Sequence, residues 1–301
     1  MSESLKMTSF RYNRSFSVIT NYLYILPFMF FFVVFFTFPV FQGLYISFTE
    51  WRGAGQPIYV GLKNYIELFH DKLFYTTLKN TLIYVLEFFP LSVIVPLLLA
   101  VAINRYIIGL DFFKFALVAP MVVSVSAVGL IWKWMFNTTF GLINYYLEKV
   151  GIPGPNWFMD SKFAMLAIVL TSLWWGIGWN LIIFSAGIKN IPQELYEAAQ
   201  IDGANRWACF WYITLPNLTQ TLLFITVTGL IGSFRVFGQV YVLTEGGPYD
   251  STRTLVYYIY NNGFKYFKMG YAASISWILF IIILGITLLQ FKYLRGWGEQ
   301  Q

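Results

Sequence analysis

The chain has 301 residues, of which 58% are hydrophobic, 21% aromatic and only 11% charged, and its net charge is +6. A water-soluble domain of this length needs far more charge to cover its surface, so the composition indicates an integral membrane protein. The Lys and Arg residues form no cluster, which argues against nucleic acid as a partner. The single cysteine, Cys209, and the single histidine, His70, give no basis for a disulfide or a metal site.

The N-terminal segment is basic at Lys6, Arg11 and Arg14 and leads into a long apolar stretch. That stretch exceeds the length of a signal peptide and is followed by no small-residue cleavage site, which predicts a retained first span. About 20 apolar residues cross the hydrocarbon core of a bilayer as a helix, and six stretches qualify. None alternates as barrel strands do, so we expect an all-α integral membrane fold, with one domain over residues 1–301. The expected spans are residues 22–48, 76–104, 112–136, 163–188, 217–243 and 271–291.

The connections between the expected spans differ between the two sides of the membrane. Those near residues 49–75, 137–162 and 245–270 are rich in Gly, Pro and aromatic residues, which predicts compact, ordered caps. On the other side, the connection at 104–111 is short and 189–216 is the one substantial element. Lys and Arg are spread over both sides, so the charge count alone does not fix the orientation.

Residues 189–216 combine a polar composition with the signals of two short helices. Pro192 suits a first helical turn, and Glu194 and Glu197 then lie near the positive end of the helix dipole. Gly203 is placed to end this helix in a left-handed conformation. Helical spacing gives the first helix a narrow face of mostly small residues, formed by Leu195, Ala198, Ala199 and Asp202.

A second short helix from about Asn205 is expected to pack its aromatic side on the membrane bundle. That side carries Trp207, Phe210, Trp211 and Thr214. The acidic and small face of the first helix would then point outwards, towards a groove on another protein. The alternative is an interfacial helix without a partner, but such helices usually carry Lys and Arg on the polar face.

Residues 197–216 and the segments that flank them resemble a known family. EAAQIDGA (197–204), followed by ITLP (213–216), is similar to the EAA coupling signature of ABC importer permeases. The flanking segments SLWWGIGWNLIIFSAGIKNIP, VYVLTEGGPYDSTRTL, GYAASIS and LLQFKYL resemble the carbohydrate-uptake branch, specifically the maltose-type first permease subunit. The resemblance covers nearly the whole chain.

The resemblance implies a binding-protein-dependent sugar importer in a bacterial-type inner membrane, with both termini and the EAA loop in the cytoplasm. The loop would dock into a cleft on an ATPase subunit, through Glu197, Ala198, Ala199, Asp202 and Gly203, with Glu194 just before them on the same helix. The implied partners are a second homologous permease, two ATPase subunits and an extracytoplasmic solute-binding protein. This sequence contains no G-x-x-x-x-G-K-[ST] phosphate loop, so ATP and Mg are expected on the partner ATPases and no cofactor in this chain.

Two strips of residues are candidates for the substrate path. The fourth span offers Trp175 and Trp179, with Gly176 and Asn180, at i,i+4 spacing, and Ser172 one turn earlier. The fifth span offers Ser233, Arg235, Val236 and Gln239, together with Gly232. A packing or interfacial cluster of tryptophans is the alternative for the first strip.

The same resemblance assigns the maltose-type pocket to these two segments, with Trp174 and Gly176 matching its pattern. The polar amides of the family are replaced here by Ser233, Arg235 and Val236, which points to a di- or oligosaccharide that could be anionic. A charge within a span is costly and normally functional, so Arg235 is either a substrate ligand or the partner of Glu87 in a structural ion pair.

Two other classes of function were weighed against a permease subunit. A self-sufficient secondary transporter or channel would need inverted repeats or paired carboxylates within the membrane, and Glu87 alone is thin support. A membrane enzyme would need a cluster of His, Cys, Asp or Glu, and none is visible in the sequence. We therefore expect a non-catalytic transport subunit.

Overall fold

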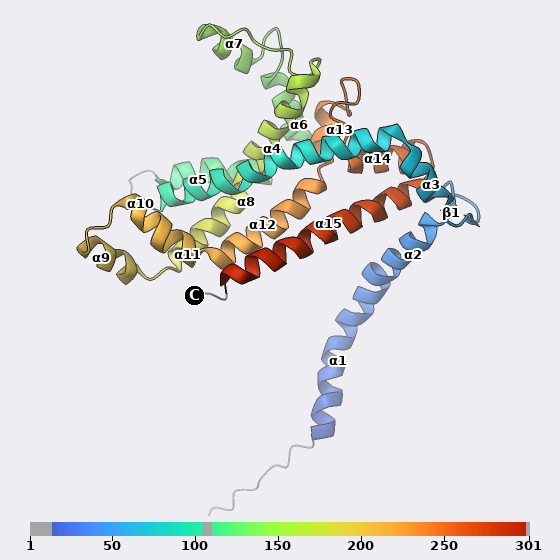
Figure 1. The fold of residues 1–301 in the computed structure, drawn as a ribbon, viewed down its shortest axis with the longest axis horizontal. Helices are drawn as coiled ribbons and strands as arrows, with labels where there is room; N and C mark the ends of the chain where they lie inside the picture. Colours follow the sequence, from blue (N-terminus) through green and yellow to red (C-terminus); the bar gives the residue numbers. More distant parts are fainter. Residues whose placement is uncertain (1–13, 105–109, 299–301) are drawn as a thin grey trace, which may run out of the picture.

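The computed structural model describes residues 14–104 and 110–298 and consists mainly of helices (Figure 1). Within these residues, five stretches are long and apolar enough to cross a membrane. They agree with the first, second, fourth, fifth and sixth expected spans to within a few residues. The stretches are Leu23–Ser47, Lys72–Ile103, Ser161–Lys189, Thr219–Leu243 and Met269–Lys292.

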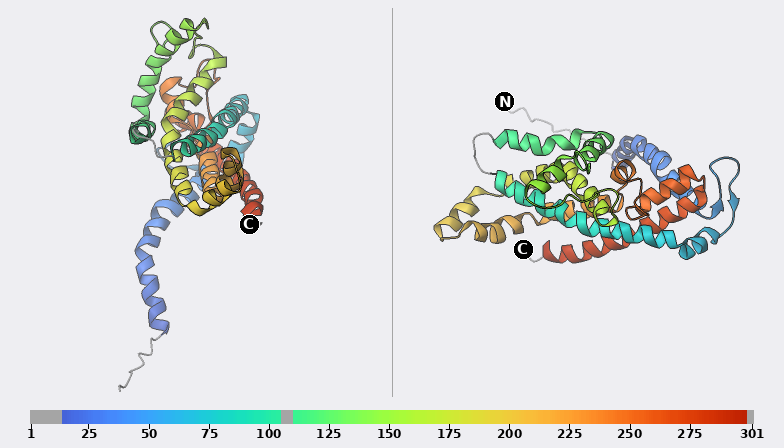
Figure 2. Two further views of the ribbon diagram at one scale, coloured as in Figure 1. Left: turned by 90° about the vertical axis from the view of Figure 1, so that its left-hand side faces the viewer. Right: turned by 90° about the horizontal axis from the view of Figure 1, so that it is seen from above.

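The first span stands apart from the other helices. It consists of α1 (Arg14–Phe32), a π-helical turn (Val33–Thr37) and α2 (Phe38–Ser47). Figures 1 and 2 show α1 projecting away from the bundle, and no residue in the most apolar window of this span is buried. Helix α2, by contrast, packs against α15 (Met269–Gly298).

Four long helices form the body of the molecule and lie side by side in Figures 1 and 2. They are α4 (Lys72–Ile103), α8 (Ser161–Lys189), α12 (Thr219–Phe234) and α15. Leu97 and Ala100 of α4 share one core with Leu181 and Phe184 of α8. Phe74 of α4, Phe234 of α12 and Ile275 of α15 share another, so α4 connects the two halves of the bundle.

The third expected span, 112–136, is wrong as a single helix. The chain forms α5 (Leu110–Val118), a 3-10 turn (Ala119–Val122) and α6 (Val125–Met135), and the two halves are bent by 109°. Pro120 lies in the turn, where a continuing helix would lose a backbone hydrogen bond. Val123 is extended, and Ser124 begins a new helix by accepting a hydrogen bond from the Ala127 amide.

The fifth span is also interrupted. Helix α12 ends at Phe234, and a short helix, α13 (Gly238–Leu243), continues the span after three non-helical residues. Those three residues are Arg235, Val236 and Phe237. The interruption therefore lies within the strip that the sequence suggested for substrate.

The three Gly- and Pro-rich connections are ordered, as expected. The first contains β1 (Thr49–Glu50), which pairs antiparallel with β2 (Ile58–Tyr59), and α3 (Lys63–His70). The second contains α7 (Leu142–Lys149). The third contains α14 (Leu255–Tyr260) and a π-helical turn (Asn261–Lys265), which the sequence analysis did not anticipate.

A helix–turn–helix lies at the end of the bundle opposite β1 and α14 (Figure 1). It begins with α9 (Gln193–Ile201), and Gly203 has a φ of +80°, which confirms the expected left-handed end. Pro192 lies just before the first turn rather than in it. The second part consists of α10 (Arg206–Cys209), a π-helical turn (Phe210–Thr214) and α11 (Leu215–Asn217).

Candidate functional site

A cavity of about 570 Å³ lies between α8 and the interrupted fifth span. All nine residues that the sequence suggested for the substrate path line this cavity, although what they do there stays a prediction. From α8 they are Ser172, Trp175, Gly176, Trp179 and Asn180, and from the fifth span Ser233, Arg235, Val236 and Gln239.

Hydrogen bonds to neighbouring segments fix two of the polar groups on α8. The Trp175 indole donates to the Val123 carbonyl, at the break in the third span, with an N–O distance of 2.9 Å. The Asn180 amide donates to the Ser92 carbonyl of α4 over 2.8 Å. These groups therefore hold the cavity wall in place, and Trp175 presents its ring rather than a free N–H.

A close backbone approach also positions the break in the third span. A Cβ at Gly178 would come within 2.8 Å of the Val118 Cα and 3.0 Å of the Leu117 carbonyl oxygen. Only glycine leaves room for the end of α5 to lie directly on α8 at this level. The bend brings Val125 of α6 to the cavity.

The groups that face the cavity combine apolar rings with one cation. Trp179 is 58% exposed, so its ring is accessible. Ser233 is buried and donates its hydroxyl to the Gly229 carbonyl of its own helix over 2.7 Å. Arg235 is exposed at the end of α12, where its guanidinium can donate several hydrogen bonds to an anion.

The alternative interpretation of Arg235 as the partner of Glu87 is wrong. Among the described residues, ion pairs join four other combinations, and both Arg235 and Glu87 are exposed. Arg235 lines the cavity, whereas Glu87 does not. The four ion pairs are Lys63–Glu50, Lys114–Asp111, Arg253–Asp250 and Lys268–Glu67.

The second span also contributes to the cavity wall, which was not predicted from the sequence. Tyr84, Phe88 and Ser92 of α4 line the cavity at successive i,i+4 positions, a strip that helical spacing could have revealed. Phe237, in the interruption of the fifth span, also lines it. Trp174, by contrast, does not line the cavity and packs edge-on against Trp132, with ring centres 5.7 Å apart.

The helix–turn–helix presents the residues of the EAA signature on its surface. Glu194, Glu197, Ala198, Asp202 and Gly203 are exposed, and Ala199 is half-buried. The Gln193 amide donates to the Glu197 carboxylate over 2.9 Å, which orients that acid on the outer face of α9.

Contacts near both ends of this element connect it to the bundle. The hydroxyls of Tyr196 and Thr214 lie 2.9 Å apart and join α9 to the turn that precedes the fifth span. Ile191, just before α9, is buried in one core with Leu218 at the start of α12. A displacement of α9 would therefore act on both the fourth and the fifth span.

The prediction that the aromatic side of the second short helix packs on the bundle is only partly correct. Phe210 packs against the bundle core and Thr214 is buried, but Trp207 and Trp211 are 68% and 55% exposed. A π-helical turn, Phe210–Thr214, follows α10, and its wider turn gives Trp211 a different direction from the one that a regular helix would give.

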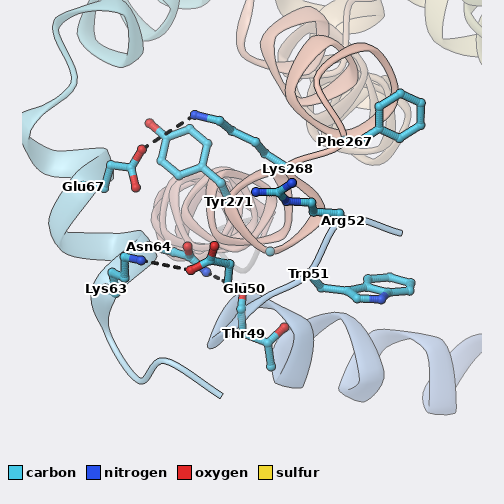
Figure 3. A pocket seen from close by; sticks show the side chains of 11 residues that line it. Thr49, Glu50, Trp51, Arg52, Lys63, Asn64, Glu67, Phe267, Lys268 and Tyr271 are labelled. Carbon is cyan, nitrogen blue, oxygen red and sulfur yellow. Dashed lines mark hydrogen bonds and ion pairs between the residues drawn. The ribbon is translucent and has the colours of Figure 1, made fainter. Parts of the chain in front are cut away.

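A second, smaller pocket of about 180 Å³ lies at the opposite end of the bundle, where β1, α3 and α15 meet (Figure 3). Lys63 pairs with Glu50 over 2.9 Å, and this hydrogen-bonded contact lowers the pKa of the Glu50 carboxyl. Lys268 lies 4.0 Å from Glu67 on the other side of the pocket. These two ion pairs connect α3 to β1 on one side and to the segment before α15 on the other.

Within residues 14–104 and 110–298, no group of three or more His, Cys, Asp or Glu side chains could hold a metal ion.

Comparison with known proteins gives matches over nearly the whole chain. Residues 5–294 match the family described as "Binding-protein-dependent transport system inner membrane component". The chain is 38% identical to the arabinooligosaccharides transport system permease protein AraP of Bacillus subtilis, covering 90% of this chain and 87% of AraP. It is 35% identical to the sn-glycerol-3-phosphate transport system permease protein UgpA of Agrobacterium fabrum, covering 92% and 95%.

The fold has a counterpart among solved structures. The chain superposes with a TM-score of 0.83 on a chain from a bacterial ABC transporter involved in the import of the acidic polysaccharide alginate. The match covers 94% of this chain and 98% of the other, at 24% sequence identity. At that level of identity the likeness establishes a shared fold.

Proposed function

We propose that this chain is one permease subunit of an ATP-driven importer for a di- or oligosaccharide. The chain belongs to the family of binding-protein-dependent transport system inner membrane components, and the proposal proceeds from that membership. The observation that carries this proposal is the cavity between α8 and the fifth span. Its wall combines accessible tryptophan with hydroxyl and amide groups, which suits a ligand with apolar ring faces and a polar rim.

The single exposed cation in the cavity favours an acidic sugar. Arg235 lines the same cavity as Trp179 and Gln239, and no acidic residue lines it. An anionic ligand is attracted by a cation, and a guanidinium can hold a carboxylate through two parallel hydrogen bonds. AraP and UgpA are named for a neutral and an anionic substrate respectively, so membership of the family is compatible with either charge.

We further propose that this subunit pairs with a second, homologous permease. The apolar window of the first span has no buried residue, and the cavity is open rather than enclosed. An exposed apolar span and an open cavity both suit a heterodimer in which two permeases enclose one path.

The ATPase partners would dock at α9. Its exposed face carries acidic and small residues, which suits a protein groove better than anionic lipid headgroups. ATP and Mg would be bound by these two partner subunits, because this sequence has no phosphate loop, and this chain would hydrolyse no ATP itself. The solute-binding protein would dock at the opposite end, on the caps formed by β1, α3, α7 and α14.

This arrangement places α9 in the cytoplasm. The described C-terminal end of α15 lies at the same end of the bundle as α9 (Figure 1), which supports a cytoplasmic C-terminus. The first 13 residues, for which we propose the same side, lie outside the described residues. A self-sufficient secondary transporter is disfavoured because Glu87, the acid of the second span, does not line the cavity.

Sugar-stimulated ATPase activity of the assembled complex tests the proposal. Complexes purified through a tag on this chain are screened, together with the binding protein, against neutral oligosaccharides, uronate oligosaccharides and amino acids. We expect stimulation by at least one sugar class and by no amino acid. Copurification without ATPase subunits, or stimulation by amino acids alone, would overturn the assignment.

A further inference from the structure

A row of four aromatic rings continues from the cavity towards the caps at the opposite end from α9. Phe237 lines the cavity, and its ring centre lies 5.1 Å from that of Tyr260 and 5.5 Å from that of Tyr241. Tyr241 and Tyr260 are 5.5 Å apart, and Tyr260 stacks on Phe264 at 5.6 Å. These four residues, Phe237, Tyr241, Tyr260 and Phe264, are here named the aromatic row.

The backbone beneath the aromatic row is held in place by the core. Leu255 and Tyr258, on one side of α14, are buried with residues of α4 and α15. Tyr257 and Tyr260 lie at i and i+3 on the other side of α14, and Phe264 follows in the π-helical turn Asn261–Lys265. Tyr257 is only 2% exposed and lies behind the row, 6.3 Å from Phe237 and 6.4 Å from Tyr260.

The rings of the aromatic row remain accessible. Tyr241 is 41% and Phe264 63% exposed, whereas Phe237 and Tyr260 are half-buried. Two of the four rings carry a hydroxyl, so the row offers apolar faces edged by hydrogen-bonding groups. That combination matches a sugar ring, which has an apolar C–H face and a rim of hydroxyls, better than it matches a lipid chain.

Two cations lie near this surface. Arg235 lines the cavity together with Phe237. Lys265, the residue after Phe264, is exposed, and its ammonium lies 5.8 Å from the centre of the Tyr257 ring behind the row. The carboxylates of an acidic oligosaccharide would be attracted by both cations. Its sugar rings would stack on the aromatic side chains of the row.

We propose that the aromatic row is an outer subsite for the sugar units of an acidic oligosaccharide, through which the substrate passes from the binding protein to the cavity. This inference rests on the proposed function and adds a length preference to it. The cavity would hold the leading sugar units, and the aromatic row would hold the units that follow. A disaccharide in the cavity would leave Tyr260 and Phe264 without a sugar contact.

Uptake of a length series of oligouronates by the reconstituted full complex tests this subsite. For Phe264→Leu and Tyr260→Leu, we expect the concentration for half-maximal uptake of a tetrasaccharide to rise about fivefold, the effect of losing one ring contact. The value for a disaccharide should stay unchanged. Tyr266→Leu is the matched control, because Tyr266 is 58% exposed on the same segment but stacks on no ring of the row.

The outcomes separate the subsite from the function on which it rests. If the unmodified complex takes up no oligosaccharide, the proposed function fails and the subsite with it. If the unmodified complex takes up both sugars but the row variants behave like Tyr266→Leu, or weaken both lengths equally, only the subsite is refuted. A length effect confined to neutral oligosaccharides would contradict the acidic class.

Labelling of a single cysteine gives a readout that does not depend on full activity. Cys209 is the only cysteine of the chain, so Phe264→Cys in a Cys209→Ser background places one thiol in the row. We expect the uronate tetrasaccharide, delivered by the binding protein, to slow maleimide labelling of this thiol, and the disaccharide to leave it unchanged. Labelling that is insensitive to every sugar would indicate that lipid or the second permease covers the row, and would overturn the proposal.

Discussion

Asp71 joins three helices at a single carboxylate. It begins α4 by accepting a hydrogen bond from the Leu73 amide over 2.8 Å. Its other oxygen accepts from the hydroxyls of Tyr258 and Tyr271, the latter over 2.7 Å. Burial opposes the charged form, but these hydrogen bonds outweigh it and lower the pKa of Asp71 from its ordinary value of 3.8.

The lowered pKa predicts a pH-dependent stability. An acid whose pKa is lower in the folded state stabilises the protein above its unfolded pKa, and this stabilisation is lost as the pH falls through the folded value. We expect Asp71→Asn to cost about 1–3 kcal/mol at neutral pH, typical of hydrogen bonds to a charged group. Thermal unfolding in detergent should show the difference from the unmodified chain shrinking below about pH 4. A constant difference from pH 3 to 7 would contradict this assignment.

Arg235 is predicted to favour acidic sugars over neutral sugars. Arg235→Gln keeps a hydrogen-bonding side chain but removes the cation that lines the cavity. Losing a charge-assisted contact should raise the half-saturating concentration of an acidic sugar about tenfold, with neutral sugars little affected. Uptake kinetics of matched uronate and neutral oligosaccharides measure this, with Arg235→Lys as the charge-retaining control. Equal losses for both sugars would assign Arg235 a structural role.

At the scale of elements, the break in the third span depends on Gly178. Gly178→Ala would force the Val118 backbone away from α8, because the new Cβ would lie 2.8 Å from its Cα. We expect a loss of about 1–3 kcal/mol, the usual cost of overpacking, measured as a lower unfolding temperature of the purified complex. Gly176→Ala is the contrast, since its Cβ would meet nothing within 4 Å and would only intrude on the cavity. Equal stability of the two variants would refute the close-packing argument.

Helix α9 is predicted to carry the coupling contact at Glu197. Glu197→Lys reverses the charge of an exposed side chain, so folding of this subunit should be spared. We expect ATP-driven uptake to fall about tenfold or more, as for the loss of one charged contact across an interface. Gln200→Lys, on an exposed position of the same helix, is the control. Unchanged uptake and assembly with Glu197→Lys would rule out this role.

The elements also show where reasoning from sequence succeeds and where it stops. Long apolar stretches predict the spans, because the hydrocarbon thickness sets their length. The 109° bend in the third span is not visible in hydropathy, since Pro120 and Ser124 change the backbone direction without changing the apolar character. The π-helical turn that contains Trp211 is likewise not visible in the sequence, and Trp211 is exposed.

For the whole molecule, the cavity wall was predictable only in part. Helical spacing identified the strips of α8 and the fifth span, because the residues of each strip are neighbours along one helix. It did not identify Tyr84 or Phe88, whose part in the cavity follows from the packing of α4 against α8. Trp175 and Asn180 were expected to face substrate, yet each also donates a hydrogen bond that holds the wall together.

The molecule as a whole connects two surfaces at opposite ends. The helix–turn–helix with α9 is joined to the fourth and fifth spans, and the same two spans form the cavity. The aromatic row then leads from the cavity towards the caps. This layout suits a path that opens and closes when α9 is moved by a partner.

The dependence of uptake on the partner ATPases shows whether motion of α9 drives the path. Sealed vesicles containing both permeases are prepared with and without the ATPase subunits, and uptake of a labelled oligosaccharide is measured with the binding protein outside and ATP inside. Uptake should require the ATPases and ATP and should be insensitive to collapse of ion gradients. Uptake at the same rate without ATPases, abolished by collapsing an ion gradient, would contradict the account.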